Sequence, residues 1–168
     1  DTIAQPEASA IAVKWFKMQL DKTIAEVDDS FSKYRLSEAM MAVYKLFWDE
    51  FSSWYLEMVK PGYQQPIDKA TYEATLGFFD ALLRLLHPFM PFITEEIFTH
   101  LQSDEETIML SAWPEFKAEW NFDENEKEID LIKEAVRAIR NIRAEMNVVP
   151  SKKATVFVVT QDSVIADM

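Results

Sequence analysis

One segment of the chain is apolar on almost all sides. Between residues 36 and 59 the sequence reads LSEAMMAVYKLFWDEFSSWYLEMV, and its polar positions recur at intervals of three, four and seven. This spacing is typical of an α-helix whose polar side chains form one narrow stripe. Aromatic and methionine side chains, including Trp48 and Trp54, fill the rest of the circumference. We expect this helix to be the enclosed, central member of a helical bundle, because only neighbours on two or three sides could bury it.

Amphipathic segments lie on both sides of this helix. Apolar residues recur at intervals of three and four from about residue 7 to 32 and again from about 69 to 86, which predicts two further helices. The short connection before residue 36 predicts that the first two helices are antiparallel neighbours. Lys60-Pro61-Gly62 ends the apolar helix, and Asp68 is positioned to cap the next one.

Beyond residue 87 the predicted elements are a short helix and an extended strap. A fourth, short helix is predicted to begin at Pro88 or Pro91. The acidic segment 102–125 lacks helical periodicity, so we expect an extended strap that Trp113 and Phe116 hold against the bundle.

A fifth amphipathic helix is predicted over about residues 126–146. The β-branched run KKATVFVVT at 152–160 then predicts a strand, which we interpret as the start of a small α/β piece. The predicted fold is therefore mostly α, an up-down helical bundle with a strap, a fifth helix and an incomplete α/β piece. We assign residues 1–117 to the bundle and 118–168 to a C-terminal subdomain.

The composition argues against several classes of function. Only Gly62 and Gly77 are present, so the sequence has no glycine-rich phosphate loop. Cysteine is absent, and His87 and His100 lie thirteen residues apart without a partner at ligand spacing, which argues against a zinc site or a cysteine nucleophile. No apolar run approaches the roughly 20 residues that cross a bilayer. We expect a soluble cytoplasmic chain with no membrane partner.

Charge is distributed unevenly along the chain. The net charge is −12, yet residues 129–153 carry six cations and three anions, so this segment is net +3 and the remainder −15. At 100° per residue, Lys133, Arg137 and Arg140 lie within about 40° of one line, a basic stripe that could follow a phosphate backbone. A solvated face with local ion pairs is an equally open interpretation. Arg143 lies among the apolar residues instead and needs a carboxylate or carbonyl partner within the fold.

Five segments together indicate a family, namely FSKYRLSEA at 31–39, WDEFSSWYLE at 48–57, LLRLLHPFMPFITEEIF at 82–98, IMLSAWPEF at 108–116 and IRNIRAEMNVVPSKK at 139–153. The sequence closely resembles the C-terminal helical anticodon-binding domain of bacterial valyl-tRNA synthetases, from about residue 11 onward. HPFMPF-type segments also occur in the related isoleucyl, leucyl and methionyl enzymes, and the same domain of an isoleucyl enzyme is an alternative. The WYLE ending and the last segment resemble the valyl enzymes specifically.

The resemblance implies a module that binds the anticodon arm of tRNA(Val), while a separate catalytic domain uses ATP and Mg²⁺ to attach valine. The HIGH-like and KMSKS-like motifs of such enzymes are absent here, so this chain alone is expected to be non-catalytic and to hold no cofactor. A helix with an Asn-Lys-x-Trp-Asn stretch, which reads anticodon bases in the family, would lie before Asp1. The implied partners are tRNA(Val) and the remaining domains of the same synthetase, and not DNA.

The candidate tRNA-binding residues form two groups. In the first turn, a basic pair flanks an aromatic side chain that could stack on a base, although a core position for that aromatic is equally open. The second group would contact phosphates. A helical interaction module that touches no RNA is the alternative function. The candidates are Lys33, Tyr34 and Arg35 in the first group, and Lys133, Arg137, Arg140, Lys152 and Lys153 in the second.

Overall fold

The structure is a computed structural model that describes residues 3–101, 107–115, 117, 123–149, 151–153 and 155. Contacts divide the chain into two compact units, Asp1–Ile129 and Asp130–Met168. The division at residue 117 that we expect between the bundle and a C-terminal subdomain stays a prediction. None of the helices in the described part of the chain combines the length and apolar surface that a bilayer crossing needs.

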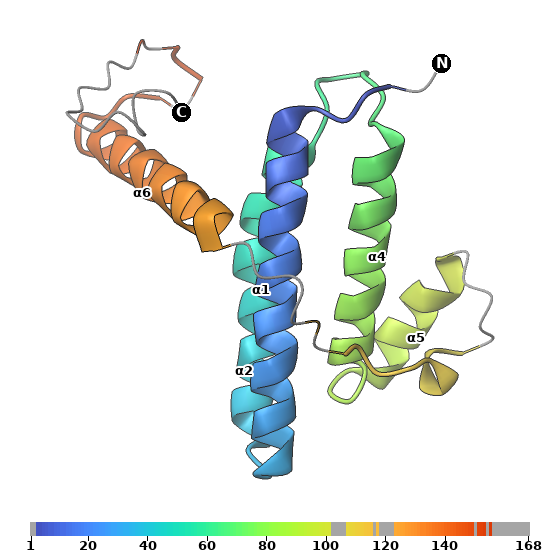
Figure 1. Cartoon of the computed structure of the whole chain (residues 1–168). Helices are drawn as coiled ribbons and strands as arrows, with labels where there is room; N and C mark the ends of the chain where they lie inside the picture. Colours follow the sequence, from blue (N-terminus) through green and yellow to red (C-terminus); the bar gives the residue numbers. More distant parts are fainter. Residues whose placement is uncertain are drawn as a thin grey trace. The chain divides into compact units, whose positions relative to one another are not determined.

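Helices make up all the regular secondary structure of the described residues (Figure 1). The mostly α prediction is confirmed, whereas the predicted strand at 152–160 lies outside the described residues except for Lys152, Lys153 and Thr155. In chain order the elements are α1 (Glu7–Ser32), α2 (Leu36–Lys45), the π-helix η1 (Leu46–Tyr55), α3 (Leu56–Val59), α4 (Lys69–Leu86), α5 (Pro91–His100), the 3₁₀ turn η2 (Ile108–Leu110) and α6 (Asp123–Glu145).

The centre of the first unit is α1, which contacts α2, η1, α3 and α4 (Figure 1). Its Trp15 and Phe16 are fully buried. The Phe16 ring lies 5.3 Å from Phe51, 5.0 Å from Tyr55 and 4.9 Å from Phe78, measured between ring centroids. Aromatic rings at these separations attract one another as well as burying apolar area. The core is thus built around α1, and the prediction that the helix over 36–59 is central is wrong.

The segment 36–59 also keeps a large apolar surface in water. Met40, Tyr44 and Trp48 are exposed, and Trp54 is half-buried. The expectation that this helix is enclosed on most sides is therefore wrong. The reason is geometric: α1 and α4 contact the same flank of the segment that carries Val43, Phe51 and Tyr55, and no described element covers the opposite flank.

Within this segment the helix widens. Residues Leu46–Tyr55 form a π-helix, in which backbone hydrogen bonds join residues five apart. Two serine hydroxyls repeat that spacing, because Ser52 Oγ donates to the Phe47 carbonyl at 2.9 Å and Ser53 Oγ donates to the Trp48 carbonyl at 2.8 Å. An α-helical period applied across 46–55 therefore misplaces side chains around the axis.

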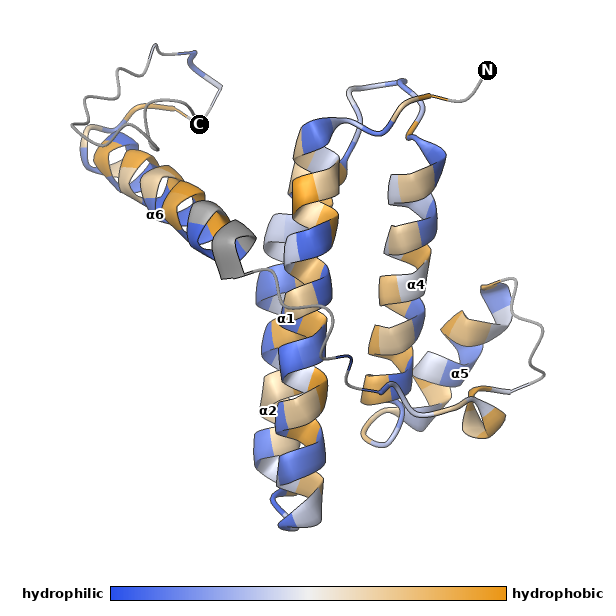
Figure 2. Cartoon of the chain, viewed as in Figure 1, coloured by the Kyte–Doolittle hydropathy of each residue, from blue (hydrophilic) through white to orange (hydrophobic). Residues whose placement is uncertain are grey.

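The helix boundaries follow local chemistry. The Asp68 carboxylate accepts a hydrogen bond from the Thr71 amide at 2.8 Å, which confirms the predicted cap of α4. Pro91 is the first residue of α5, where a missing N–H costs nothing. In contrast, α6 begins at Asp123, three residues before the predicted start. Figure 2 shows apolar residues (orange) along α6 among polar ones.

The strap is only partly extended, because η2 interrupts it with one 3₁₀ turn. The prediction that Trp113 attaches it to the bundle is confirmed. Trp113 Nε1 donates to Asp28 at 3.0 Å, and its ring lies 5.8 Å from Phe31. The Lys117 amide donates to the Asp21 carboxylate. Phe116 lies outside the described residues.

Candidate functional site

The first candidate residues lie where α1 turns into α2. The Tyr34 amide donates to the Phe31 carbonyl at 3.0 Å, and the Arg35 amide donates to the Ser30 carbonyl at 2.8 Å. This pair of bonds is a Schellman motif, which requires a left-handed residue at the turn. That residue is Tyr34, with φ of 57°. A tyrosine therefore occupies a backbone position that favours glycine or asparagine.

The Tyr34 side chain points into solvent. It is 90% exposed, and its ring makes no hydrogen bond or ring contact with the residues that the structure describes. Of the two interpretations that the sequence left open, the core position is excluded. The fold thus accepts both an unfavourable backbone conformation and an exposed aromatic ring at this turn, with no packing contact to offset them.

The two cations beside Tyr34 share one acid. Lys33 Nζ donates to Asp29 Oδ2 at 2.7 Å, and Arg35 Nη2 donates to the same oxygen at 3.0 Å. Arg35 also reaches Glu38 at 2.9 Å. The hydrogen bond from Lys33, together with the charges of Lys33 and Arg35, lowers the pKa of Asp29 against the opposing effect of burial. All these pairs are exposed and hence weak, so a polyanion could compete for both cations.

The predicted basic stripe is only partly at the surface. Arg137 and Arg140 are exposed on α6, as are Lys152 and Lys153 after it. Lys133 is only 5% exposed, and its ammonium lies 4.0 Å from Asp130. Lys133 is therefore not presented alongside the two arginines, because equal angular spacing on a helix does not make exposure equal.

Arg143 has the structural role that its apolar setting predicts. Its Nη2 donates to the carbonyls of Val149 and Lys152, both at 2.8 Å. The end of α6 is a second Schellman motif with Asn147 in the left-handed conformation at φ of 52°. Arg143 thus fixes the course of the chain after α6, and with it the backbone that carries Lys152.

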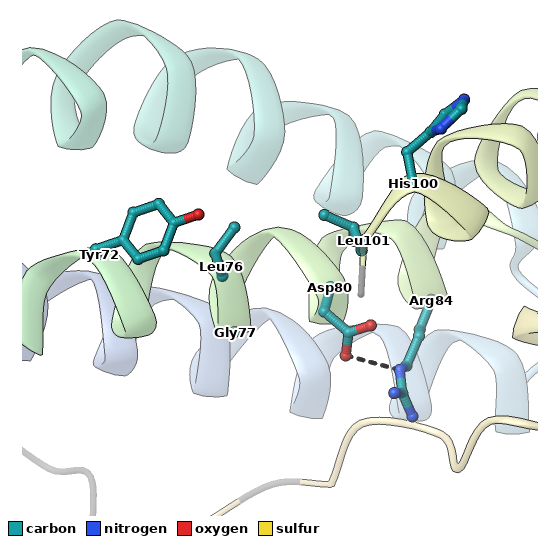
Figure 3. Close-up of a pocket in the computed structure, with 7 residues that line it drawn as sticks. All are labelled: Tyr72, Leu76, Gly77, Asp80, Arg84, His100 and Leu101. Atoms are coloured by element: carbon teal, nitrogen blue, oxygen red, sulfur yellow. Dashed lines mark ion pairs between the residues drawn. The ribbon is translucent and has the colours of Figure 1, made fainter. Parts of the chain in front are cut away.

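A hollow of about 510 Å³ lies between α4 and the end of α5 (Figure 3). Tyr72 and Leu76 form its apolar part, and the Asp80 carboxylate pairs with Arg84 Nε at 2.9 Å. These two charged groups pair with each other, and His100 lies at the rim contributed by α5. Among the described residues, no group of three or more His, Cys, Asp and Glu side chains is placed to hold a metal ion.

One exposed pair was missed by sequence reasoning. The rings of Tyr44 and Trp48 lie nearly parallel, at an interplanar angle of 9° and a centroid distance of 6.4 Å. They are 52% and 58% exposed. Their spacing of four residues is the spacing of a core row, so the pattern alone favours burial. Only the side of α2 on which α1 packs distinguishes the two outcomes.

The matching family model is described as the anticodon-binding domain of tRNA ligase, and it covers residues 13–158. The chain belongs to this family. Full-length relatives of this anticodon-binding domain are named valine–tRNA ligase. Over 157 residues this chain is 71% identical to the valine–tRNA ligase of Parabacteroides distasonis, and the match covers 92% of this chain and 18% of the relative. The matches to Porphyromonas gingivalis (58%, covering 92% and 18%) and Phocaeicola vulgatus (56%, covering 87% and 17%) are similar.

These matches confirm the resemblance to the valyl enzymes. The anticodon-binding domain spans less than one fifth of the length of these relatives. Its candidate residues at the α1–α2 turn and on α6 all lie within the region that the family model covers.

Proposed function

We propose that this anticodon-binding domain binds the anticodon arm of tRNA(Val) as part of a valine–tRNA ligase. The observation that carries the proposal is the family match over residues 13–158, together with 71% identity to a valine–tRNA ligase. Binding of an RNA loop by exposed aromatic and basic side chains is consistent with the surface at Tyr34. The other domains of the ligase are its partners in the same polypeptide.

The contribution of the domain to aminoacylation is to position the tRNA. Holding one end of the substrate fixes where its acceptor end can lie, which lowers the entropic part of the barrier at a distant catalytic centre. ATP and Mg²⁺ belong to that centre and to the activation of valine. The anticodon-binding domain takes no covalent step in this scheme.

Phosphate contacts in this proposal are local. A net charge of −12 repels RNA overall, so binding depends on places where cations outnumber acids. The exposed Arg137, Arg140, Lys152 and Lys153 meet that condition. Lys133 is left out of the phosphate-binding set because it is buried beside Asp130. Lys33 and Arg35 join once RNA phosphates displace their exposed carboxylate partners.

A salt titration tests the proposal. Binding of a tRNA(Val) transcript to the 168-residue chain is measured from low to moderate salt, with an anticodon-substituted transcript as the control. We expect affinity to fall linearly with salt on a double-logarithmic plot and to drop further for the substituted anticodon. Equal affinity for both transcripts would show phosphate contact without base recognition and would contradict anticodon binding.

The acidic surface favours one alternative function, a helical module that contacts other protein domains and no RNA. A charge of −15 outside residues 129–153 suits a basic protein surface better than a polyanion. Absence of tRNA binding even at the lowest salt would support this alternative.

A further inference from the structure

The chain after α6 forms a turn that one side chain of the helix holds. Arg143 lies in the last turn of α6, and its Nη2 donates to the carbonyls of Val149 and Lys152, both at 2.8 Å. The Val149 carbonyl also accepts from the Lys152 amide at 3.1 Å, which closes a four-residue turn. The Val148 amide donates to the Arg143 carbonyl at 2.8 Å, so this arginine holds the start of the segment as well. Arg143 therefore ties both ends of the segment to α6.

The backbone of Lys152 is fixed, whereas its side chain is exposed. The Lys152 amide donates to Val149, and the Lys152 carbonyl accepts from Arg143. Lys153 follows directly, and both lysine side chains are exposed. Neither lysine forms an ion pair with any residue that the structure describes. The two charges are thus available to a ligand and start from a defined place in the chain.

The surroundings of this turn are basic. Between residues 138 and 160 the sequence has four cations and one acid, so this segment is net +3. A hollow of about 500 Å³ lies at the end of α6, and none of the described residues that line it carries a carboxylate. Local charge therefore favours an anionic ligand such as an RNA phosphate. The lining residues are Arg140, Arg143, Ala144, Asn147, Val148 and Val149.

We propose that Arg143 is a positioning residue for tRNA binding, which holds Lys152 and Lys153 in place for RNA phosphates without contacting RNA itself. The inference rests on the proposed function, since it requires the anticodon-binding domain to bind RNA. An unrestrained segment would lose backbone freedom whenever its lysines bound phosphates, and this loss would weaken binding. Because Arg143 orders the segment in the free protein, that loss accompanies folding rather than binding.

The test is a double-mutant cycle on the tRNA(Val) affinity of the 168-residue chain. Arg143→Ala should bind about 5- to 30-fold more weakly than the wild type, the factor for ordering the backbone of one residue. In a Lys152→Ala/Lys153→Ala background the same substitution should change affinity by less than about 2-fold, because no lysine remains to be positioned. The two lysine substitutions alone should lower the salt slope by about 1.4–1.8, the value for two phosphates.

Arg137→Ala is the matched control, because it removes an exposed arginine that lies about 9 Å from Arg143 along the same helix. Its loss of affinity should be the same in both backgrounds, since Arg137 acts independently of the lysines. Arg137→Ala should also lower the salt slope by about 0.7–0.9, whereas Arg143→Ala should leave the slope parallel to that of the wild type.

Hydrogen exchange of the free protein provides a measurement that does not involve RNA. The Lys152 amide should exchange faster in Arg143→Ala than in the wild type, because the turn that protects it loses the guanidinium. Thermal unfolding of each variant by circular dichroism confirms that the rest of the fold is retained.

The outcomes are distinguishable. Wild-type affinity in Arg143→Ala would overturn the positioning role, and so would unaltered exchange of the Lys152 amide. An equal loss of affinity in both backgrounds would overturn it too, because Arg143 would then contact RNA itself. If the wild-type chain binds and the double lysine variant binds equally well, the positioning role fails and the proposed function stands. Failure of the wild-type chain to bind at low salt would overturn the proposed function, and the positioning role with it.

Discussion

Replacing Tyr34 by glycine should stabilise the domain and weaken its binding of RNA. Tyr34 has φ of 57° in the turn between α1 and α2, and its side chain is 90% exposed. A side chain in the left-handed region costs about 1–2 kcal/mol, which glycine avoids. Glycine loses about 0.5–1 kcal/mol more backbone entropy on folding. With no packing contact to lose, the difference predicts a gain of about 0.5–1 kcal/mol in the free energy of unfolding.

Urea denaturation followed by circular dichroism measures this gain. In a thermal melt the same gain corresponds to a rise of roughly 1–4 °C for a chain of this size. Tyr34→Ala is the matched control, because it removes the ring and keeps the left-handed strain, so it should not be stabilised. Asn147→Gly relieves less strain at the equivalent turn after α6, since asparagine tolerates this conformation, and should give a smaller gain.

The RNA measurement separates strain from function. If Tyr34 stacks on a base, Tyr34→Gly and Tyr34→Ala should lose tRNA(Val) affinity equally, by about 1–3 kcal/mol. A destabilised Tyr34→Gly would refute the argument from backbone strain. Unchanged affinity in both variants would show that the exposed ring has no part in RNA binding.

Three further predictions concern charge, pH and packing. The double variant Arg137→Ala/Arg140→Ala should lower the salt slope of tRNA binding by about 1.4–1.8, and an unaltered slope would remove both residues from the phosphate contacts. The pKa of Asp29 is lowered in the folded state, so its contribution to stability is present above about pH 4 and is lost as pH falls through the folded pKa. Asp29→Asn should therefore flatten the acid limb of a urea-denaturation series, which an unchanged acid limb would contradict. Phe16→Ala should cost about 3–5 kcal/mol and Trp48→Ala under about 1 kcal/mol, as measured by urea denaturation, and comparable costs would contradict the placement of the core around α1.

Features set by neighbouring residues could be predicted from the sequence. The Asp68 cap, a start of α5 at one of two prolines and the need of Arg143 for a carboxylate or carbonyl partner could each be predicted from the sequence nearby. The attachment of Trp113 was predictable for a different reason, because a large apolar side chain in a polar strap has few places to be buried. The sequence places Tyr34 in the turn between the first two helices, but it does not predict the left-handed backbone conformation of that residue.

Features set by the three-dimensional arrangement could not be predicted. The segment 36–59 carries apolar residues around more of its circumference than α1 does, and only packing shows that α1 is the shared neighbour. The widened backbone of η1 cannot be detected by a method that assumes the α-helical period. The exposure of Trp48 depends on which side of a helix another element covers.

The central claim is that this domain binds the anticodon end of tRNA(Val). It is tested most directly by comparing the affinity of the 168-residue chain for two isolated RNA hairpins at low salt, the anticodon stem–loop and the acceptor-stem minihelix of the same tRNA. The anticodon stem–loop should bind more tightly than the minihelix and should compete with the full tRNA. Preference for the minihelix, or equal affinity for the two hairpins, would contradict it.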